Sequence, residues 1–295
     1  MSWPAVDEVD AWLSAREADV ANLRPAARKR VHWAGSPGVQ TPLSVVFVHG
    51  FSACCEEIRP VTDNIAKALG ANLHYTRLAG HGRDGAAMAE PSFEDWLAST
   101  HEALQIGRII GREVVVISCS TGGPLVCLEM AANGVDGLAA QLFVSPNFDI
   151  QNFAGRMAMR VPGFQWWGPK ILGWERSFTP HNPGHAAHWT TTYPLLSLMP
   201  MRVCLAKFRA LDLGRFRMPA LTVYSEDDKV VSPAAAKRAA WGWGGPASLH
   251  PVTVGEGDDV NAHVIAGDIL SPGQTAPVTS AALRWLKEAG FDVQA

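Results

Sequence analysis

The stretch from Glu113 to Pro124 constrains the fold of this chain more than any other. It begins with a β-branched apolar run, Val114 to Ile117, which is typical of a buried strand. Small residues follow at once, and a helix-compatible stretch then runs from about Leu125 to the stop signal Asn133-Gly134. A strand, a tight turn and a helix in this order expose a side chain of the turn above the end of a sheet. Ser120, at the centre of the turn, is therefore a candidate nucleophile.

The size and charge of the chain narrow the classes of protein to consider. Its 295 residues suffice for one large α/β domain with an insertion, or for two small domains. The net charge of -3 gives no global field that would attract nucleic acid or acidic lipid. No apolar run approaches the roughly 18 residues that cross a bilayer, and the acidic N-terminus lacks the order of a signal peptide. We therefore expect a cytoplasmic protein with no membrane span and no nucleic-acid partner.

Neither the cysteines nor the histidines form a pattern that predicts a metal site or a disulfide framework. The cysteines are odd in number and have no metal-type spacing: Cys54, Cys55, Cys119, Cys127 and Cys204. Three histidines, His181, His185 and His188, lie close together, but Pro183-Gly184 interrupts any helix there and no carboxylate or cysteine is in phase. We expect no metal and no cofactor, and interpret the cysteines as small packing residues.

Strand-like and helix-like segments alternate along most of the chain, which predicts a mostly parallel sheet flanked by helices. The expected strands cover about 28–34, 43–48, 71–78, 113–117, 138–145, 220–225 and 248–254, and the expected helices include 5–24, 56–69, a segment from Ser92, and 278–289. The alternation breaks between about 148 and 213. We therefore expect a sheet domain made of residues 1–147 and 214–295, with a helical cap of residues 148–213 inserted into it.

The cap segment is rich in Trp, Phe and Met and shows no strand pattern. Such side chains bury much area and adapt to the shape of an apolar ligand, although they also serve to fasten a cap to its core. We expect both uses. The residues expected to contact a substrate are Phe51, Cys119, Phe164, Trp166, Trp167 and Trp189.

Polar residues follow the late strands at the edge where Ser120 is expected. A serine hydroxyl needs a neighbouring base, and the base needs an acid to orient it. His263 follows the last strand at this edge, whereas His250 lies at the start of that strand, at the opposite edge. The acid comes from the run that begins at Glu226, with Asp228 favoured and Asp227 the alternative. Asp258 and Asp259 are interpreted as solvated loop charges or supporting groups.

Five motifs together resemble the α/β-hydrolase superfamily, and most closely its bacterial serine hydrolases of the monoacylglycerol-lipase and carboxylesterase type. They lie at 46–52 (VFVHGFS), 77–82 (RLAGHG), 118–123 (SCSTGG), 225–233 (SEDDKVVSP) and 263–268 (HVIAGD), and the resemblance covers about residues 43–288. It implies an α/β-hydrolase fold with a mostly parallel eight-stranded sheet and a cap after the sixth strand. It also implies a catalytic triad of Ser120, Asp228 and His263.

The resemblance further implies an oxyanion hole and exposes one departure from the family pattern. Its two donors would be the backbone N–H groups of Phe51 and Thr121, and the ring of His49 would brace the first loop by hydrogen bonding. The family's turn reads Gly-x-Ser-x-Gly, because strand and helix nearly touch there. Here Ser118 stands in place of the first glycine.

The function expected from these features is hydrolysis of a carboxylic ester with an apolar acyl or alcohol part, through an acyl-enzyme. Lactone, thioester and amide hydrolysis, and acyl transfer, use the same groups. A non-catalytic ligand-binding or sensing protein on the same scaffold is the alternative if Ser118 spoils the turn. Dehalogenase and epoxide-hydrolase chemistry is disfavoured, because those relatives need Asp where this chain has Ser120.

Overall fold

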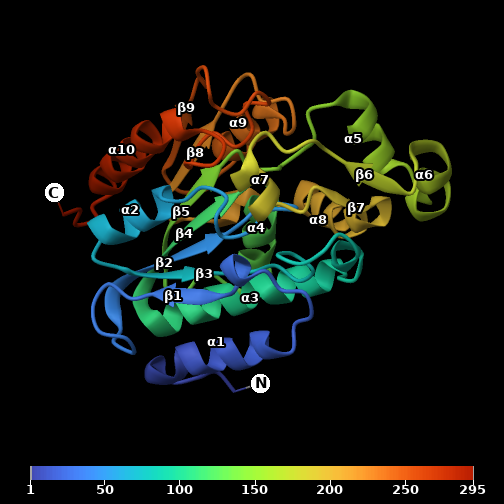
Figure 1. Cartoon of the computed structure of the whole chain (residues 1–295). Helices are drawn as coiled ribbons and strands as arrows, with labels where there is room; N and C mark the ends of the chain where they lie inside the picture. Colours follow the sequence, from blue (N-terminus) through green and yellow to red (C-terminus); the bar gives the residue numbers. More distant parts are fainter. Residues whose placement is uncertain (1, 295) are drawn as a thin grey trace.

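Seven strands form the central sheet of the computed structural model, which describes residues 2–294 (Figure 1). Their spatial order is β1 (Arg30–His32), β3 (Asn72–Tyr75), β2 (Thr41–Val48), β4 (Gly111–Cys119), β5 (Leu138–Val144), β8 (Ala220–Tyr224) and β9 (Ala247–Pro251). All neighbours are parallel except β1, which is antiparallel to β3. The α/β fold with a mostly parallel sheet is thus confirmed.

The seven strands expected from the residue pattern all form, but the eight strands that the family resemblance implied are not found in the described part of the chain. One short strand, β1, precedes β2, because residues 9–18 form helix α1 (Val9–Ala18) and residues 35–38 are bends and turns. The insertion consequently follows the fifth strand of the sheet, β5, and not the sixth.

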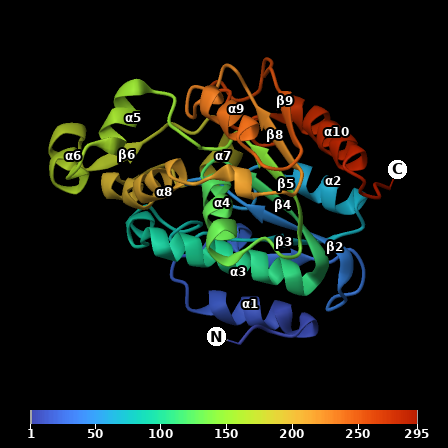
Figure 2. The same cartoon turned by 180° about the vertical axis from the view of Figure 1, so that it is seen from behind.

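Helices cover both faces of the sheet, and alternate strand residues pack against them (Figure 2). One face packs on α2 (Val61–Ala68) and α10 (Pro272–Glu288), through strand residues such as Val45 and Ile117. The other packs on α3 (Phe93–Ile110), α4 (Gly122–Asn133) and α9 (Pro233–Trp241). This burial on both faces explains why the strands read as continuous apolar runs.

The cap segment, residues 148–213, contains helices and one small sheet. Its helices are α5 (Phe153–Arg160), α6 (Phe164–Leu172), α7 (Pro183–His188) and α8 (Met199–Arg209). The expectation of no strands here is wrong, since β6 (Glu175–Ser177) pairs antiparallel with β7 (Thr192–Pro194). In Figure 1, α5 and α6 stand apart from the sheet at one end of the molecule, whereas α8 packs on the core beside α3 and α4.

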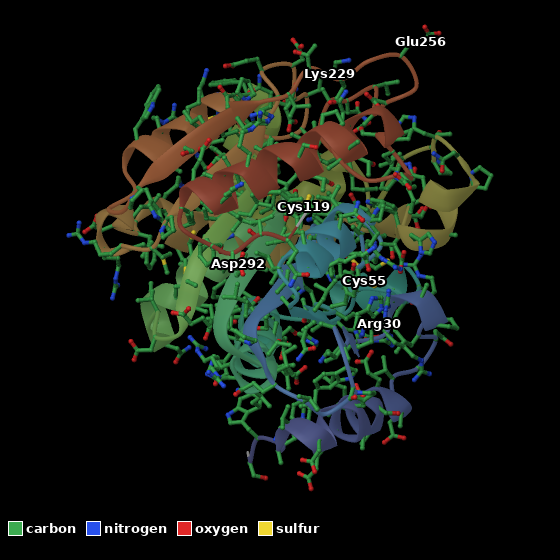
Figure 3. The ribbon with its side chains drawn as sticks, turned by 90° about the vertical axis from the view of Figure 1, so that its left-hand side faces the viewer. Arg30, Cys55, Cys119, Lys229, Glu256 and Asp292 are labelled. Atoms are coloured by element: carbon green, nitrogen blue, oxygen red, sulfur yellow. The ribbon has the colours of Figure 1, made fainter. Side chains whose placement is uncertain are left out.

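The helices of residues 2–294 are all too short or too polar to cross a membrane. The five cysteines are free and buried, as expected of packing residues. Figure 3 places Cys119 inside the molecule and Cys55 close to Arg30, whose guanidinium donates to the Cys55 sulfur at 3.1 Å.

Candidate active site

Ser120 lies in the turn between β4 and α4, in a backbone conformation that non-glycine residues seldom adopt. Its φ is +48°, and its side chain is nearly buried. Strand and helix approach so closely that a Cβ added to Gly122 would lie 2.2 Å from the carbonyl oxygen of Val48. The turn therefore holds the serine in a fixed, strained geometry at the carboxyl edge of the sheet.

Three side chains from distant parts of the chain form a hydrogen-bonded series. His263 Nε2 lies 3.1 Å from Ser120 Oγ, and His263 Nδ1 lies 2.9 Å from Asp228 Oδ2. The other oxygen of Asp228 accepts from the backbone N–H groups of Val230 and Val231 at 2.7 and 2.9 Å. These bonds fix the carboxylate, which in turn orients the ring.

The alternatives for the acid and the base lie elsewhere. Asp227 is exposed, so Asp228 alone of the doublet reaches the histidine. His250 is the fourth residue of β9 rather than its first, and it lies outside the set of residues that line the cavity at Ser120. Asp258 and Asp259 are buried supporting groups rather than solvated charges. Asp259 accepts from the backbone N–H groups of His263 and Val264, and Asp258 accepts from Gly255 in the same loop and from Gly273 at the start of α10.

The environment of His263 favours its protonated form. Burial of the ring opposes the charge, but the Asp228 carboxylate outweighs this effect, so that the pKa of His263 rises above its usual 6.5. A more basic imidazole is a better acceptor for the serine proton.

The loop after β2 is braced as expected. The ring of His49 accepts a hydrogen bond from the backbone N–H of Leu78 at 3.1 Å, and burial lowers its pKa to about 4, which keeps it neutral. The N–H of Gly50 donates to the Glu57 carboxyl at 2.6 Å. Of the two expected oxyanion donors, Thr121 directly follows Ser120 in the chain, at the start of α4. Phe51 follows Gly50 in the loop after β2 and lines the same cavity as Ser120.

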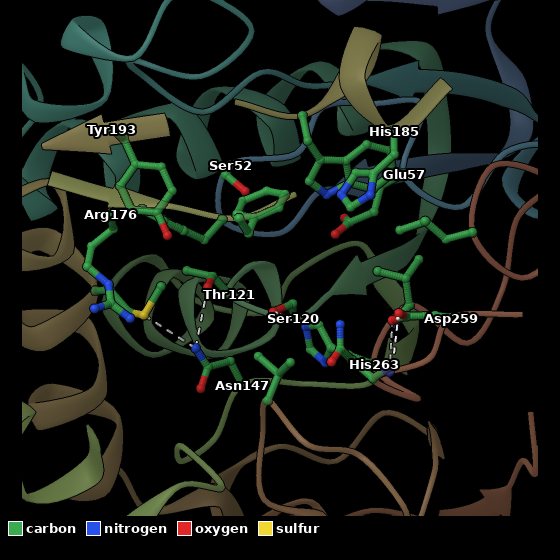
Figure 4. A pocket seen from close by; sticks show the side chains of 18 of the residues that line it. Ser52, Glu57, Ser120, Thr121, Asn147, Arg176, His185, Tyr193, Asp259 and His263 are labelled. Atoms are coloured by element: carbon green, nitrogen blue, oxygen red, sulfur yellow. Dashed lines mark hydrogen bonds between the residues drawn. The ribbon is translucent and has the colours of Figure 1, made fainter. Parts of the chain in front are cut away.

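A cavity of about 540 Å³ opens at Ser120 and His263, between the sheet edge and the cap segment (Figure 4). Of the residues expected to contact a substrate, Phe51 and Trp189 line it. Aromatic and aliphatic side chains supply much of the remaining wall: Ile150, Phe178, Tyr193, Leu198, Met201, Val264 and Leu270.

The other expected substrate contacts lie outside this cavity wall. Cys119 belongs to the apolar core on the α2–α10 face of the sheet. Phe164 is buried against Trp167, with ring centroids 5.3 Å apart, and the ring of Trp166 is 72% exposed. The sequence shows that the cap segment is rich in aromatic residues, but the path of its helices decides which of them face the cavity.

Several polar residues of the wall were missed by sequence reasoning: Glu57, Asn147, Arg176, His181 and His185. The rings of His181 and His185 stack with centroids 5.3 Å apart. Within residues 2–294, these and the other His, Cys, Asp and Glu side chains form no group of three that could hold a metal ion.

Comparisons with known proteins agree with this architecture. A family profile described as the alpha/beta hydrolase family matches residues 45–278. The thermostable monoacylglycerol lipase of Bacillus sp. (strain H-257) is 30% identical over 195 residues, which cover 66% of this chain and 74% of the lipase. The 2-succinyl-6-hydroxy-2,4-cyclohexadiene-1-carboxylate synthase of Salmonella typhimurium is 31% identical over 135 residues, but the match covers only 46% of this chain and 50% of the synthase.

Solved structures show the same fold at low sequence identity. A structure from work on LipS and LipT, two metagenome-derived lipolytic enzymes, superposes with a TM-score of 0.71 at 19% identity, over 90% of this chain and 99% of that one. A soluble variant of the monoglyceride lipase of Saccharomyces cerevisiae gives 0.61 at 14% identity, over 89% and 91%. The matched profile covers well over half of the sequence, and the chain therefore belongs to the alpha/beta hydrolase family.

Proposed function

We propose that the protein is a serine esterase that cleaves carboxylic esters with an apolar acyl or alcohol part. The observation that carries this proposal is the bonded series from Ser120 Oγ through His263 to Asp228, at the wall of a largely apolar cavity. In this proposal, residues 148–213 act as the cap of the site.

In the reaction, Ser120 Oγ attacks the ester carbonyl while His263 Nε2 takes the hydroxyl proton. Asp228 stabilises the resulting imidazolium. The backbone N–H groups of Phe51 and Thr121 bind the oxyanion of the tetrahedral intermediate, which collapses as His263 gives the proton to the departing alcohol. His263 then activates a water molecule, which releases the acid from Ser120 and restores the enzyme.

The apolar wall supports an ester with a hydrophobic portion, and the similarity to a monoacylglycerol lipase points the same way. Lactones, thioesters and amides would use the same groups, as would acyl transfer where water is excluded. The second candidate is a ligand-binding or sensing protein on this scaffold, in which Ser120 does not react.

Labelling with a fluorophosphonate separates the two candidates, because an activated serine displaces fluoride from the reagent and is phosphonylated. We expect rapid labelling of the native protein and none of Ser120→Ala. Ser145→Ala is a matched control, since Ser145 is also a buried serine at a strand end with a positive φ, and its labelling should be unchanged. Absence of labelling of the folded native protein would favour the sensor. A series of p-nitrophenyl esters of increasing acyl length would then show which chain length the cavity accepts best.

A further inference from the structure

Glu57 is a buried carboxyl group that faces the site but has no part in the Ser-His-Asp mechanism. Its residue is 2% exposed, and it lines the cavity that contains Ser120 and His263. Figure 4 shows the carboxyl directed from the loop after β2 into the cavity, toward Ser120 and His263. Burial of a carboxyl group is costly, so its presence at this position needs an explanation.

Glu57 and the nucleophile meet on the two sides of Gly50. The Gly50 N–H donates to Glu57 Oε2 at 2.6 Å. A Cβ added to Gly50 would lie 2.6 Å from Glu57 Oε1 and 2.9 Å from Ser120 Cβ. Only a glycine therefore fits between the carboxyl and the nucleophile. The carboxyl thus holds the His49–Gly50 peptide, one residue before Phe51, a proposed oxyanion donor.

The positive charge that interacts with the Glu57 carboxylate is the one that protonation places on His263. No lysine or arginine among residues 2–294 forms an ion pair with this carboxylate. Burial raises the pKa of Glu57 to about 7, against the opposing effects of the Gly50 N–H, of charge on His263 and of the Cys119 thiol. The Glu57 charge also raises the pKa of His263, after the larger effect of Asp228. The other titratable or charged groups of the cavity wall are Asp259, His181, His185, Tyr193 and Arg176.

We infer that Glu57 is a positioning residue of the proposed esterase reaction, acting through Gly50 and His263. Through the Gly50 N–H it fixes the loop that presents the Phe51 donor. As a carboxylate it also stabilises the imidazolium that forms on His263 when Ser120 gives up its proton. The inference rests on the proposed function.

Two substitutions separate these contributions. Glu57→Gln keeps an acceptor for Gly50 and a similar volume but removes the charge, so the acidic limb of kcat/KM against pH should move down by about half a unit and kcat should fall about tenfold. Glu57→Leu removes the acceptor as well, and kcat should fall about 100-fold with KM changed less than about threefold. Glu129→Gln, a buried glutamate bonded to His101 on the α3–α4 side, is the matched control and should leave the profile unchanged.

The outcomes also distinguish this inference from the function on which it rests. Fluorophosphonate labelling with an unshifted profile and native kcat in Glu57→Gln would reject the role of Glu57 and leave the esterase assignment intact. A folded native protein that is neither labelled nor active would reject both. The Gln variant decides the matter even if the Leu variant does not fold.

A second inference concerns the outer surface of the cap segment and does not depend on the esterase reaction. Helix α6 buries Phe164, Gly168 and Pro169 and turns large apolar side chains outward. The most exposed are Trp166 (72%), Ile171 (72%), Trp174 (71%) and Phe153 (67%). Phe153 belongs to α5, Trp166 and Ile171 belong to α6, and Trp174 lies between α6 and β6. In Figure 1, α5 and α6 form a lobe that stands apart from the sheet. Monomeric soluble proteins rarely expose a group of this kind without a partner.

The charge of the segment differs in sign from the rest of the chain. Residues 148–213 contain seven Lys and Arg against three Asp and Glu, which gives +4, whereas the whole chain carries -3 and the remainder therefore -7. The Arg156 guanidinium lies over the Phe153 ring, 5.6 Å from its centroid, and Lys170 directly precedes Ile171 in α6. Exposed tryptophans with neighbouring cations are the composition of a surface that binds the interface of an anionic membrane.

We propose that this lobe, defined by Phe153, Trp166, Ile171 and Trp174, docks on an anionic phospholipid surface. Sedimentation with lipid vesicles tests this docking. The vesicles consist of phosphatidylcholine with about 30% phosphatidylglycerol, which supplies the anionic surface. The native protein should bind these vesicles at least about tenfold better than pure phosphatidylcholine vesicles, and less in high salt. Ile171→Ser with Trp174→Ser should abolish binding. Trp241→Ser removes an equally exposed tryptophan on α9 and should leave it unchanged.

Failure to bind the anionic vesicles would overturn the docking proposal. So would equal binding to both kinds of vesicle. A dimer in solution that the double variant converts to a monomer would also overturn it, because the occupant of the surface would then be a second copy of the chain.

Discussion

The side-chain amide of Gln141 donates a 2.9 Å hydrogen bond to the hydroxyl of Ser118, and both residues are buried. The bond joins the end of β4 to β5 directly beneath the turn of Ser120. The hydroxyl that replaces the usual glycine of this turn is thus accommodated and satisfied. Ser118 does not displace Ser120, since the bond from Ser120 to His263 is in place.

Substitution of Ser118 by alanine should affect stability more than turnover. The Gln141 amide keeps its second acceptor, the carbonyl of Leu142, but loses one bond in a buried environment. We expect the free energy of unfolding in urea to fall by about 1 kcal/mol, with kcat/KM on a p-nitrophenyl ester within about twofold of native. A loss of turnover without a loss of stability would instead give the hydroxyl a part in the reaction.

Substitution of Gly122 by alanine should damage the site itself. The added Cβ would meet the Val48 carbonyl at 2.2 Å, so that β2 or α4 must shift and carry Phe51 or Ser120 with it. We expect kcat/KM to fall about 100-fold, as for other small displacements of reacting groups. Gly35→Ala is the control, because its Cβ would have open space, and it should behave as native. Equal activity of the two variants would contradict the close approach.

The sequence predicted those parts of the site that lie at the ends of sheet strands. Ser120, Asp228 and His263 each follow an apolar strand, and the carboxyl ends of parallel strands share one edge, so local pattern suffices to bring them together. The seven strands expected from the local pattern all form, including the three-residue β1. The eighth strand was implied only by the family resemblance, which does not report how many outer strands a particular chain has.

The cap segment and Glu57 could not be predicted in the same way. Trp166 and Trp189 look alike in sequence, yet one is exposed and the other lines the cavity, because the orientation of α6 and α7 depends on tertiary packing. Glu57 lies in a turn before α2, where a charged residue is ordinarily solvated. A signal was present in the combination of Gly50 with a carboxylate seven residues later, but only coordinates show that the two meet.

The two candidate bases should behave very differently on substitution. His263→Ala removes the only histidine bonded to Ser120 in the described residues 2–294, and turnover of p-nitrophenyl esters should fall at least about 1,000-fold. His250→Ala, on edge strand β9, should retain most of it. Comparable losses in both variants, each shown to be folded by circular dichroism, would refute the assignment of the base.

Chelators should leave the activity unchanged. Within the described residues 2–294, no three His, Cys, Asp or Glu side chains are grouped so that they could hold a metal ion. The stacked rings of His181 and His185 therefore lack a third ligand. We expect turnover after dialysis against EDTA to equal that of untreated protein. Inhibition that added zinc reverses would show that the cap histidines bind a metal.

The pH dependence should identify the acid. His263 must be neutral to accept the serine proton, so kcat/KM should fall as pH decreases through the pKa of His263, which Asp228 raises above 6.5 despite the opposing effect of burial. Asp228→Asn removes that effect, so the acidic midpoint should move to lower pH, while the plateau of kcat should fall about 1,000-fold or more because the ring loses its orientation. Asp227→Asn alters only an exposed neighbour and should leave both midpoint and plateau native. The assignment would be refuted if the acidic midpoint moved down in Asp227→Asn while Asp228→Asn kept the native profile. Asp227, and not Asp228, would then be the carboxylate that orients His263 in solution.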